Sequence, residues 1–437
     1  MDKYYILTYG CQMNEHDSEN MAKMLIEEGY EKAENPNEAN LILINTCSVR
    51  ENADKRFFGV LGQFKKRKQE DKDFIIVVAG CMPQQPHIIE KIEKQFNWVD
   101  IIIGTQTINE LPGLISKVKA GKKHAKSIVD DAEEVTEMTL GERKHSHKAL
   151  VNITYGCNNF CTYCIVPYTR GREKSRDKYK IIEEIKALAD DGVKEVMLLG
   201  QNVNSYKDKN NNGLPDLIKE IDKIDGISRI RFMTSHPKDI SDELIECFGS
   251  VEHLCKQIHL PVQSGSNDIL QKMNRRYTIE DYLKVINKLR KISPEIAIST
   301  DIIVGFPGET DDDFLKTMNL VSEVRYDSAF TFLYSKRRGT PAAIFGNQIN
   351  EDIKHKRFDK LKKLVDDISF EKNQKYKGKT VKVLVDGLSE KKSNTLAGRT
   401  DDFKLVNFFG KSNKIGDFAE VEITECKTFS LFGKEIF

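Results

Sequence analysis

Short apolar runs alternate with helical stretches over the first hundred residues of the chain. Runs at 5–10, 41–46 and 75–80 are each followed directly by a cysteine, and a fourth run at 99–104 is not. Helical stretches at 17–28 and 53–68 lie between them. Near-continuous apolar strands alternating with helices are typical of a buried parallel sheet.

The three cysteines that follow these runs are Cys11, Cys47 and Cys81. The carboxyl ends of parallel strands share one edge of a sheet, where ligands commonly bind. We therefore expect the three thiols to converge although they lie far apart in the sequence. The alternative, three unrelated buried thiols, is disfavoured because the same strand-end position recurs.

The middle of the chain repeats a strand–helix unit about six times, after a charged segment at 116–148 that we interpret as a linker or surface connection. Strands are predicted at 150–155, 195–200, 229–235, 257–262, 297–304 and 329–334, with helices at 181–189, 214–224, 242–248, 280–292 and 311–324. Six such units predict an open, partial (βα)6 barrel. Polar turns follow several of its strands, at the face where barrels of this kind carry their active sites.

The last eighty residues change character. Residues 354–379 contain ten Lys or Arg against four Asp or Glu, and they begin as an amphipathic helix with a basic outer face. Alternating segments follow at 380–385, 396–407 and 418–423, with glycines at the turns between them. This pattern predicts a small all-β barrel, and small barrels commonly bind nucleic acid.

The composition bounds the class of protein. The chain has 437 residues, of which 39% are hydrophobic and 31% charged, so we expect a globular, multidomain α/β protein. A formal net charge of +1 provides no global attraction to nucleic acid, so any RNA contact must come from local basic patches. No apolar run approaches the ~20 residues of a membrane span, and no signal peptide is apparent, so we expect a cytoplasmic protein without membrane contact.

Cysteine spacing carries the strongest chemical signal. Cys157, Cys161 and Cys164 form a C-x3-C-x2-C run directly after the first barrel strand. Three thiolates on a cubane iron–sulfur cluster leave one iron open to a small molecule. A structural zinc site would need a fourth ligand, and a ferredoxin a fourth cysteine, and neither follows; His236 and His259 are weak candidates as ligands. The other cysteines, Cys247, Cys255 and Cys426, have no ligand-like spacing and are interpreted as core or surface thiols.

Polar residues in the barrel turns suit a nucleoside ligand with a charged tail. Gln201, Asn202, Gln263 and Asp301 could hydrogen-bond an amino acid or a ribose, although ordinary turn chemistry explains them equally well. The run at 168–176 has four cations against one anion. These cations, Arg170, Arg172, Lys174 and Arg176, are candidate phosphate contacts, with a solvated loop as the alternative.

Taken together, these motifs resemble the radical S-adenosylmethionine methylthiotransferases over essentially the whole chain. The run 157–164 resembles the cluster motif of radical S-adenosylmethionine enzymes, and the strand-end cysteines resemble the family's N-terminal domain. Residues 397–400 and 406–408 resemble its TRAM domain. The resemblance implies an N-terminal cluster domain at 1–118, a radical S-adenosylmethionine core at 143–373 and an RNA-binding TRAM barrel at 376–437.

The resemblance also implies cofactors and a reaction. Two [4Fe-4S] clusters, on Cys157, Cys161 and Cys164 and on Cys11, Cys47 and Cys81, would work with S-adenosylmethionine as radical source and methyl donor. Tyr163 and Ser264 join the candidate cofactor-binding residues, and Arg399 joins the candidate RNA contacts. A 5′-deoxyadenosyl radical would remove hydrogen from C2 of an adenosine next to the anticodon of tRNA. An electron donor such as flavodoxin or ferredoxin and iron–sulfur assembly proteins are the further expected partners.

Three subfamilies fit this resemblance. They act on isopentenylated adenosine in tRNA, on threonylcarbamoyl adenosine in tRNA, or on an aspartate of a ribosomal protein. The runs at 10–18, 45–53, 165–173 and 199–206 favour the first. Methylthiolation of another target, and a non-catalytic RNA-binding iron–sulfur protein, stay open as alternatives.

Overall fold

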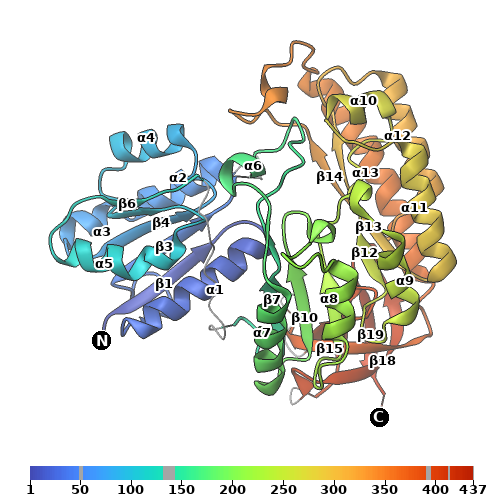
Figure 1. Cartoon of the computed structure of the whole chain (residues 1–437), viewed down its shortest axis with the longest axis horizontal. Coiled ribbons are helices and arrows are strands. Elements are labelled where there is room, and N and C mark those ends of the chain that lie inside the picture. The colour runs from blue at the N-terminus through green and yellow to red at the C-terminus, as the bar shows by residue number, and fades with distance from the viewer. Residues whose placement is uncertain (49–52, 131–142, 390–394, 412–413, 437) are drawn as a thin grey trace.

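Three units follow one another along the chain (Figure 1). The computed structural model describes residues 1–48, 53–130, 143–389, 395–411 and 414–436. Residues 49–52 of the run at 45–53 quoted above and residues 131–142 of the predicted linker therefore lie outside the described residues. In Figure 1 the first unit lies at the left, the second at the right and the third at the bottom.

The first unit is a parallel sheet with strand order β2-β1-β3-β4-β5-β6. Every residue of β3 and β4 is buried, because alternate side chains pack into two apolar clusters on opposite faces. The sheet thus has the two covered faces that its apolar runs predict. Its elements are β1 (Lys3–Thr8), α1 (Gln12–Glu27), β2 (Glu31–Lys32), β3 (Leu41–Thr46), α2 (Ala53–Gln63), α3 (Lys65–Glu70), β4 (Ile75–Gly80), α4 (Pro86–Gln95), β5 (Ile101–Ile103), η1 (Ile108–Glu110), α5 (Leu111–Lys119) and β6 (Ala125–Ser127).

This sheet continues past residue 118, where the sequence places the end of the first domain. The last strand, β6, pairs with β5 in parallel register, Ile101 opposite Ala125. The interpretation of residues from 116 onward as a linker is therefore wrong for α5 and β6, which belong to the folded unit.

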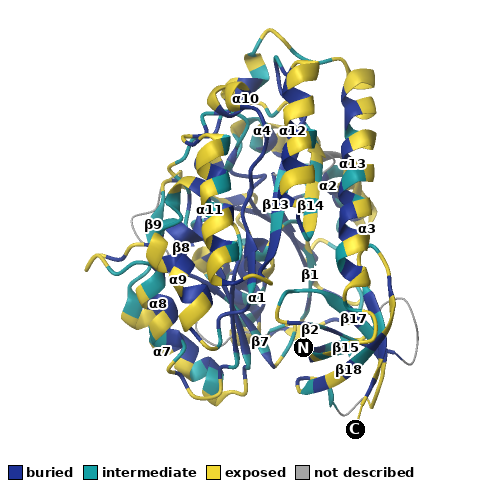
Figure 2. Ribbon diagram, turned by 90° about the vertical axis from the view of Figure 1, so that its right-hand side faces the viewer, coloured by how far each residue is buried: buried dark blue, intermediate teal, exposed yellow. Residues whose placement is uncertain are grey.

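The second unit is an open barrel of six parallel strands, as predicted. Two three-stranded sheets, β7-β10-β11 and β12-β13-β14, are connected by a single bridge between Ile230 and Leu254. Helices pack outside the strands around one large apolar core, and their outer faces are exposed (Figure 2). The elements are β7 (Lys148–Asn152), β8 (Thr154–Tyr155), α6 (Val166–Thr169), β9 (Lys174–Ser175), α7 (Lys178–Asp190), β10 (Glu195–Leu199), η2 (Val203–Ser205), α8 (Leu214–Ile221), β11 (Arg229–Phe232), η3 (Pro237–Asp239), α9 (Asp242–Ser250), β12 (Gln257–His259), α10 (Asn267–Lys272), α11 (Ile279–Ile292), β13 (Ala297–Val304), α12 (Asp311–Val324), β14 (Ser328–Leu333), η4 (Pro341–Ile344) and α13 (Glu351–Gln374).

The third unit is a closed five-stranded barrel with strand order β15-β16-β17-β19-β18. Alternate residues of its strands fill a small apolar core that includes Val383, Phe408 and Val421. The strands are β15 (Thr380–Leu388), β16 (Leu396–Arg399), β17 (Leu405–Phe409), β18 (Phe418–Cys426) and β19 (Leu431–Glu435), of which β19 was not predicted.

Two buried arginines of β11 attach the closed barrel to the open one. Arg229 donates hydrogen bonds to the backbone carbonyls of Arg399 and Lys382, at 2.7 and 3.2 Å. Arg231 donates to the carbonyls of Thr400 and Asp401, at 2.7 Å each, and its Nε donates to Glu195. These contacts fix the closed barrel at the bottom of the molecule in Figure 1. Within the described residues, no helix is both long and apolar enough to cross a membrane.

Candidate functional site

The structure brings Cys11, Cys47 and Cys81 together at one edge of the first sheet. Cys11 occupies the N-cap of α1, and Cys47 and Cys81 follow β3 and β4 directly. The backbone N–H of Cys81 donates to the carbonyl of Thr46, and a hydrogen bond from Cys47 lowers the pKa of Cys11 to about 6. Burial raises the pKa of the Cys81 thiol, because a thiolate is poorly solvated there.

Glycine and asparagine residues shape this edge. Gly80 has a positive φ of 98°, and a Cβ there would clash with the Thr46 carbonyl. The Cys11 thiol donates to Oδ1 of the fully buried Asn14 at 3.4 Å, and Nδ2 of Asn14 donates to the Thr46 carbonyl at 3.1 Å. The strand ends are therefore held close together by side chains that the sequence analysis did not single out.

The second group of thiols lies at the mouth of the open barrel. Cys157, Cys161 and Cys164 occupy the loop between β8 and α6. Gly156 begins this loop with a φ of 64°, and a Cβ there would clash with the backbone of Arg172. The loop therefore folds tightly against the following segment, and the N–H of Cys157 donates to the Gly171 carbonyl at 3.2 Å.

Hydrogen-bond donors approach two of these three sulfurs. Nη1 of the buried Arg275 lies 3.5 Å from Sγ of Cys161, and Nδ2 of Asn159 lies 3.5 Å from Sγ of Cys157. Burial raises the pKa of Cys164 to about 12. Without a further positive charge the Cys164 thiol would stay protonated at neutral pH, so the donor set fits a cationic group such as iron.

Each group offers three sulfur donors, which suits a cubane cluster with one open iron. Within the part of the chain that the structure describes, no three His, Cys, Asp or Glu side chains are arranged to hold a single metal ion. In a cubane each thiolate binds a different iron, so its ligands are spread around the cluster.

The loop that carries Cys157, Cys161 and Cys164 leads into α6, which contacts the first unit. Oγ1 of Thr105, in the first unit, donates to the carbonyl of Thr169 at 2.8 Å. Nη1 of Arg337 donates at 2.5 Å to the carbonyl of Ser48, the residue after Cys47. In Figure 1, α6 lies between the first sheet and the barrel mouth. A segment just after the triplet therefore also borders the strand-end cysteines.

The candidate cofactor-binding residues all come from the mouth of the barrel: Tyr163, Gln201, Asn202, Gln263, Ser264 and Asp301. Asp301 lies 3.5 Å from Nε2 of His259, and its carbonyl accepts the backbone N–H of Gln263, whose φ is 70°. Gln201 donates to the sulfur of Met13 at 2.6 Å. The ring of Tyr163 packs edge-on against Phe306.

Asn202 and Ser264 are buried. Nδ2 of Asn202 donates to Asp239 at 2.7 Å, and Ser264 is almost fully buried. The roles of these six residues in cofactor binding stay predictions.

The basic run at 168–176 is only partly exposed. Arg170 is buried and Arg176 is half-buried, and they are ion-paired with Asp17 and Glu184 at 2.8 and 2.6 Å. Contact of these two arginines with phosphate stays a prediction. Arg172 is exposed over the ring of Phe160.

Further cations of the predicted RNA surface differ in exposure. Lys174 is half-buried on β9. Arg399 is half-buried, with Nη1 donating to the Phe403 carbonyl at 3.0 Å. Lys354 and Arg357, predicted on the outer face of α13, are buried instead.

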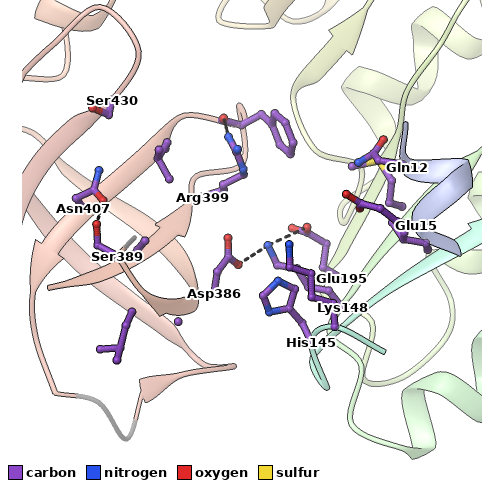
Figure 3. Close-up of a pocket in the computed structure, with 18 of the residues that line it drawn as sticks. Gln12, Glu15, His145, Lys148, Glu195, Asp386, Ser389, Arg399, Asn407 and Ser430 are labelled. Atoms are coloured by element: carbon purple, nitrogen blue, oxygen red, sulfur yellow. Dashed lines mark hydrogen bonds and ion pairs between the residues drawn. The ribbon is translucent and has the colours of Figure 1, made fainter. Parts of the chain in front are cut away.

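A cavity of about 740 Å³ lies where the three units meet (Figure 3). Its walls come from α1, from β7 and β10, and from the closed barrel, with Glu15, Lys148, Glu195, Asp386 and Arg399 around it. Lys148 bridges Asp386 at 2.5 Å and Glu195 at 3.4 Å. The six clustered cysteines do not line it. It is therefore a separate, charged recess, bordered by the closed barrel.

Three family models match successive parts of the chain. The Radical SAM superfamily matches residues 151–321, the uncharacterized protein family UPF0004 matches residues 3–104, and the TRAM domain matches residues 374–436. The matches cover the open barrel, the first sheet and the closed barrel in turn.

Among solved structures, the fold resembles that of the radical S-adenosylmethionine methyltransferase TsrM from Kitasatospora setae, with cobalamin and a [4Fe-4S] cluster bound. The TM-score is 0.56 at 14% identity, over 79% of this chain and 74% of that one. The cobalamin-dependent S-adenosylmethionine radical enzyme OxsB aligns with a TM-score of 0.55 at 12% identity, over 84% of this chain and 56% of that one. At these identities the likeness shows the fold alone.

Similarity to curated proteins extends over nearly the full length. The tRNA-2-methylthio-N(6)-dimethylallyladenosine synthase of Clostridium botulinum strain Langeland is 52% identical over 99% of this chain and 97% of its own. The enzyme of the same name from Alkaliphilus oremlandii is 51% identical over 99% of this chain and 93% of its own. By this identity and coverage, the chain belongs to the family of tRNA-2-methylthio-N(6)-dimethylallyladenosine synthases.

Proposed function

We propose that this protein replaces the hydrogen at C2 of N(6)-dimethylallyladenosine, next to the anticodon of tRNA, by a methylthio group. The observation that carries the proposal is the presence of two groups of three thiols, one in the loop at the barrel mouth and one at an edge of the first sheet, which contacts α6. Relatives named for this product align with the chain from end to end.

Cys157, Cys161 and Cys164 would hold a [4Fe-4S] cluster, and S-adenosylmethionine would bind beside it at the barrel mouth. When bound, these groups supply a radical that can break a C–H bond too weakly acidic for any side-chain base. Arg275 and Asn159 hydrogen-bond the ligand sulfurs and orient them. Tyr163 lies in the cysteine loop, Gln263 lies in the turn after β12, and Asp301 lies on β13; we keep them as candidates for binding S-adenosylmethionine.

Cys11, Cys47 and Cys81 would hold a second [4Fe-4S] cluster that presents the sulfur to be inserted. Their convergence at one strand edge and their closeness to the triplet loop support this assignment. Three protein ligands again leave an open position, which a sulfur species could occupy.

The RNA would be bound by the closed barrel and the recess beside it. The TRAM match covers this barrel, and Arg399 and Lys148 supply positive charge at the recess. The exposed Arg172 is a further candidate contact near the mouth. A flavodoxin or ferredoxin as electron donor, iron–sulfur assembly proteins as partners, and a cytoplasmic location stay predictions.

Cysteine variants of the anaerobically reconstituted protein test this division of roles. The wild type should bind about eight irons, from two cubanes, and form 5′-deoxyadenosine from S-adenosylmethionine under reducing conditions. Cys161→Ala should abolish 5′-deoxyadenosine, whereas Cys11→Ala should retain at least part of it and lose the methylthiolated nucleoside. Cys247→Ala, a buried cysteine outside both groups, is the matched control and should behave as wild type.

Two results would contradict the proposal. Equal activities of Cys161→Ala and Cys11→Ala would contradict the separate roles assigned to the two clusters. A protein that binds only zinc would contradict the radical mechanism. No observation in the structure favours threonylcarbamoyl adenosine or a ribosomal protein as the target. A non-catalytic iron–sulfur protein would yield no 5′-deoxyadenosine at all.

A further inference from the structure

Arg170 lies in an unexpected place for a residue of a basic run. It is six residues beyond Cys164 in sequence, but its guanidinium is buried in the first unit, with only 5% of its surface exposed. Its Nη2 lies 2.8 Å from Oδ2 of Asp17, which is itself 4% exposed. Asp17 belongs to α1, the helix that Cys11 caps. The ion pair therefore joins the triplet loop to the edge that carries the strand-end cysteines.

The position of this guanidinium is fixed from both sides. On its own side, the N–H of Arg170 donates to the Val166 carbonyl at 2.8 Å, closing the turn of α6. On the other side, Thr105 donates to the carbonyl of Thr169, the residue before Arg170. The cation therefore has little freedom to leave the cysteine edge.

The environment of Arg170 contains more negative character than Asp17 alone. The guanidinium of Arg170 interacts electrostatically with the thiols of Cys11 and Cys81 and hydrogen-bonds the side chain of Cys81, so it lies close to both. Burying a cation has a desolvation free energy that its partners must offset, and one carboxylate offsets only part of it. The sulfurs of Cys11 and Cys81, as thiolates, would be the second partner of the guanidinium.

Cations near an iron–sulfur cluster affect its redox equilibrium in a known direction. On reduction the cluster takes up one electron and its total charge becomes more negative by one unit. A fixed positive charge and a hydrogen bond to a ligand sulfur stabilise that more negative state, so they raise the reduction potential. In a buried site this effect is weakly screened by solvent.

We propose that Arg170 is a positioning residue of the strand-end cysteine site: its guanidinium, held by Asp17, raises the reduction potential of the cluster on Cys11, Cys47 and Cys81. This inference rests on the proposed second cluster. It gives Arg170 a role in tuning that cluster from the loop that carries the other one.

The test uses the full-length chain with Cys157, Cys161 and Cys164 replaced by alanine, so that the strand-end cluster is observed alone. Its midpoint potential is measured by anaerobic titration with titanium(III) citrate, which supplies the electron, followed by electron paramagnetic resonance. Arg170→Met removes the cation and should shift the potential to a lower value. Asp17→Asn removes the anion but keeps the cation, and should shift the potential to a higher value. Arg170→Lys keeps a positive charge, so its potential should lie closer to that of the protein with Arg170 than the potential of Arg170→Met does.

Arg172→Met is the matched control, because Arg172 is two residues away and exposed, and it should leave the potential unchanged. Opposite shifts for Arg170→Met and Asp17→Asn are a result that loosened packing would not produce. Equal potentials in these variants, with iron content intact, would overturn the role of Arg170. Absence of iron from the starting protein would instead overturn the proposed second cluster, so the two failures are distinguishable.

Discussion

At the residue scale, the cysteine sites depend on backbone positions that only glycine can occupy without strain. Gly80 has a φ of 98°, and a Cβ there would meet the Thr46 backbone. Gly80→Ala should therefore push apart the ends of β3 and β4 and displace Cys81 from Cys47. We expect the iron content to fall from about eight to about four, with a loss of about 1–3 kcal/mol in the free energy of unfolding.

An iron assay together with denaturant unfolding checks this prediction. Gly59→Ala is the control, because Gly59 lies in α2 with open space around its Cβ position. Alanine is the better helix former, so that variant should keep its iron and its stability. Full iron binding by Gly80→Ala would contradict the prediction that a Cβ at this position displaces Cys81 from Cys47.

His236 should make stability depend on pH. This buried imidazole accepts a hydrogen bond from the N–H of Lys238, and burial, together with the charge of Arg275, lowers its pKa to about 2. The unfolded chain takes up a proton near pH 6.5, whereas the folded protein does not until far lower. The stabilising contribution is thus fully present above pH 6.5 and is lost as the pH falls below it, by up to about 1.4 kcal/mol per pH unit.

Urea unfolding at pH 8, 7, 6 and 5 measures this dependence. His236→Asn keeps a side-chain acceptor without a titrating ring, so its stability should fall less steeply below pH 6.5 than that of the wild type. Parallel curves for the two proteins would mean that His236 does not carry the dependence.

Sequence patterns identified the cysteines but not their partners. Spacing and strand-end position were enough for six thiols, because both features are local in the chain. The sequence around Arg170 contains no such local signal, because its partner Asp17 is 153 positions away. A run of cations has the same sequence pattern whether the side chains bind phosphate or a buried carboxylate. Arg275 and Asn14 were missed for the same reason.

At the element scale, strands with their own apolar pattern were predictable and those defined by pairing were not. The runs that became β3 and β4 are apolar over most of their length and buried throughout. By contrast, β6 reads Ala-Lys-Ser and is a strand because β5 provides an edge for it. Similarly, α13 has the predicted apolar stripe, but two of its cations point inward, because buried acceptors lie opposite them.

Arg357 tests the role of those inward cations. Its Nη1 donates to Oε2 of Glu309 at 2.7 Å and to the Glu309 carbonyl at 3.1 Å, and so joins α13 to the turn after β13. Arg357→Met would leave the Glu309 carboxylate buried without its cation, and we expect a loss of about 3–5 kcal/mol. Lys356→Met, an exposed neighbour, should change stability by less than about 0.5 kcal/mol. Denaturant unfolding compares the two variants, and equal free energies of unfolding would contradict a structural role of Arg357.

At the scale of the whole molecule, the placement of the units relative to one another was not predictable. The contact between the closed barrel and β11 includes four hydrogen bonds from arginine side chains to backbone carbonyls, which any sequence supplies, together with an ion pair from Arg229 to Asp401. The fold of each unit follows from its pattern, whereas the recess between the units follows from a few long-range polar contacts.

Arg231→Met should loosen this docking. Two hydrogen bonds to carbonyls of the closed barrel would be lost and Glu195 would lose its Nε donor. We expect affinity for tRNA to fall at least about tenfold, the equivalent of about 1.4 kcal/mol, while 5′-deoxyadenosine formation without RNA is retained. Filter binding and product analysis measure the two activities. Arg325→Met, which removes an exposed ion pair with Glu371, is the control, and equal tRNA affinities in both variants would contradict the docking role.

Mass spectrometry of tRNA nucleosides tests whether the protein catalyses the proposed methylthiolation. Reconstituted protein, S-adenosylmethionine, a reductant and tRNA containing N(6)-dimethylallyladenosine are incubated anaerobically, and the tRNA is digested to nucleosides. We expect conversion of that nucleoside to its 2-methylthio derivative, and no conversion of tRNA whose adenosine lacks the dimethylallyl group. An unchanged nucleoside in the presence of two intact clusters and active S-adenosylmethionine cleavage would contradict it.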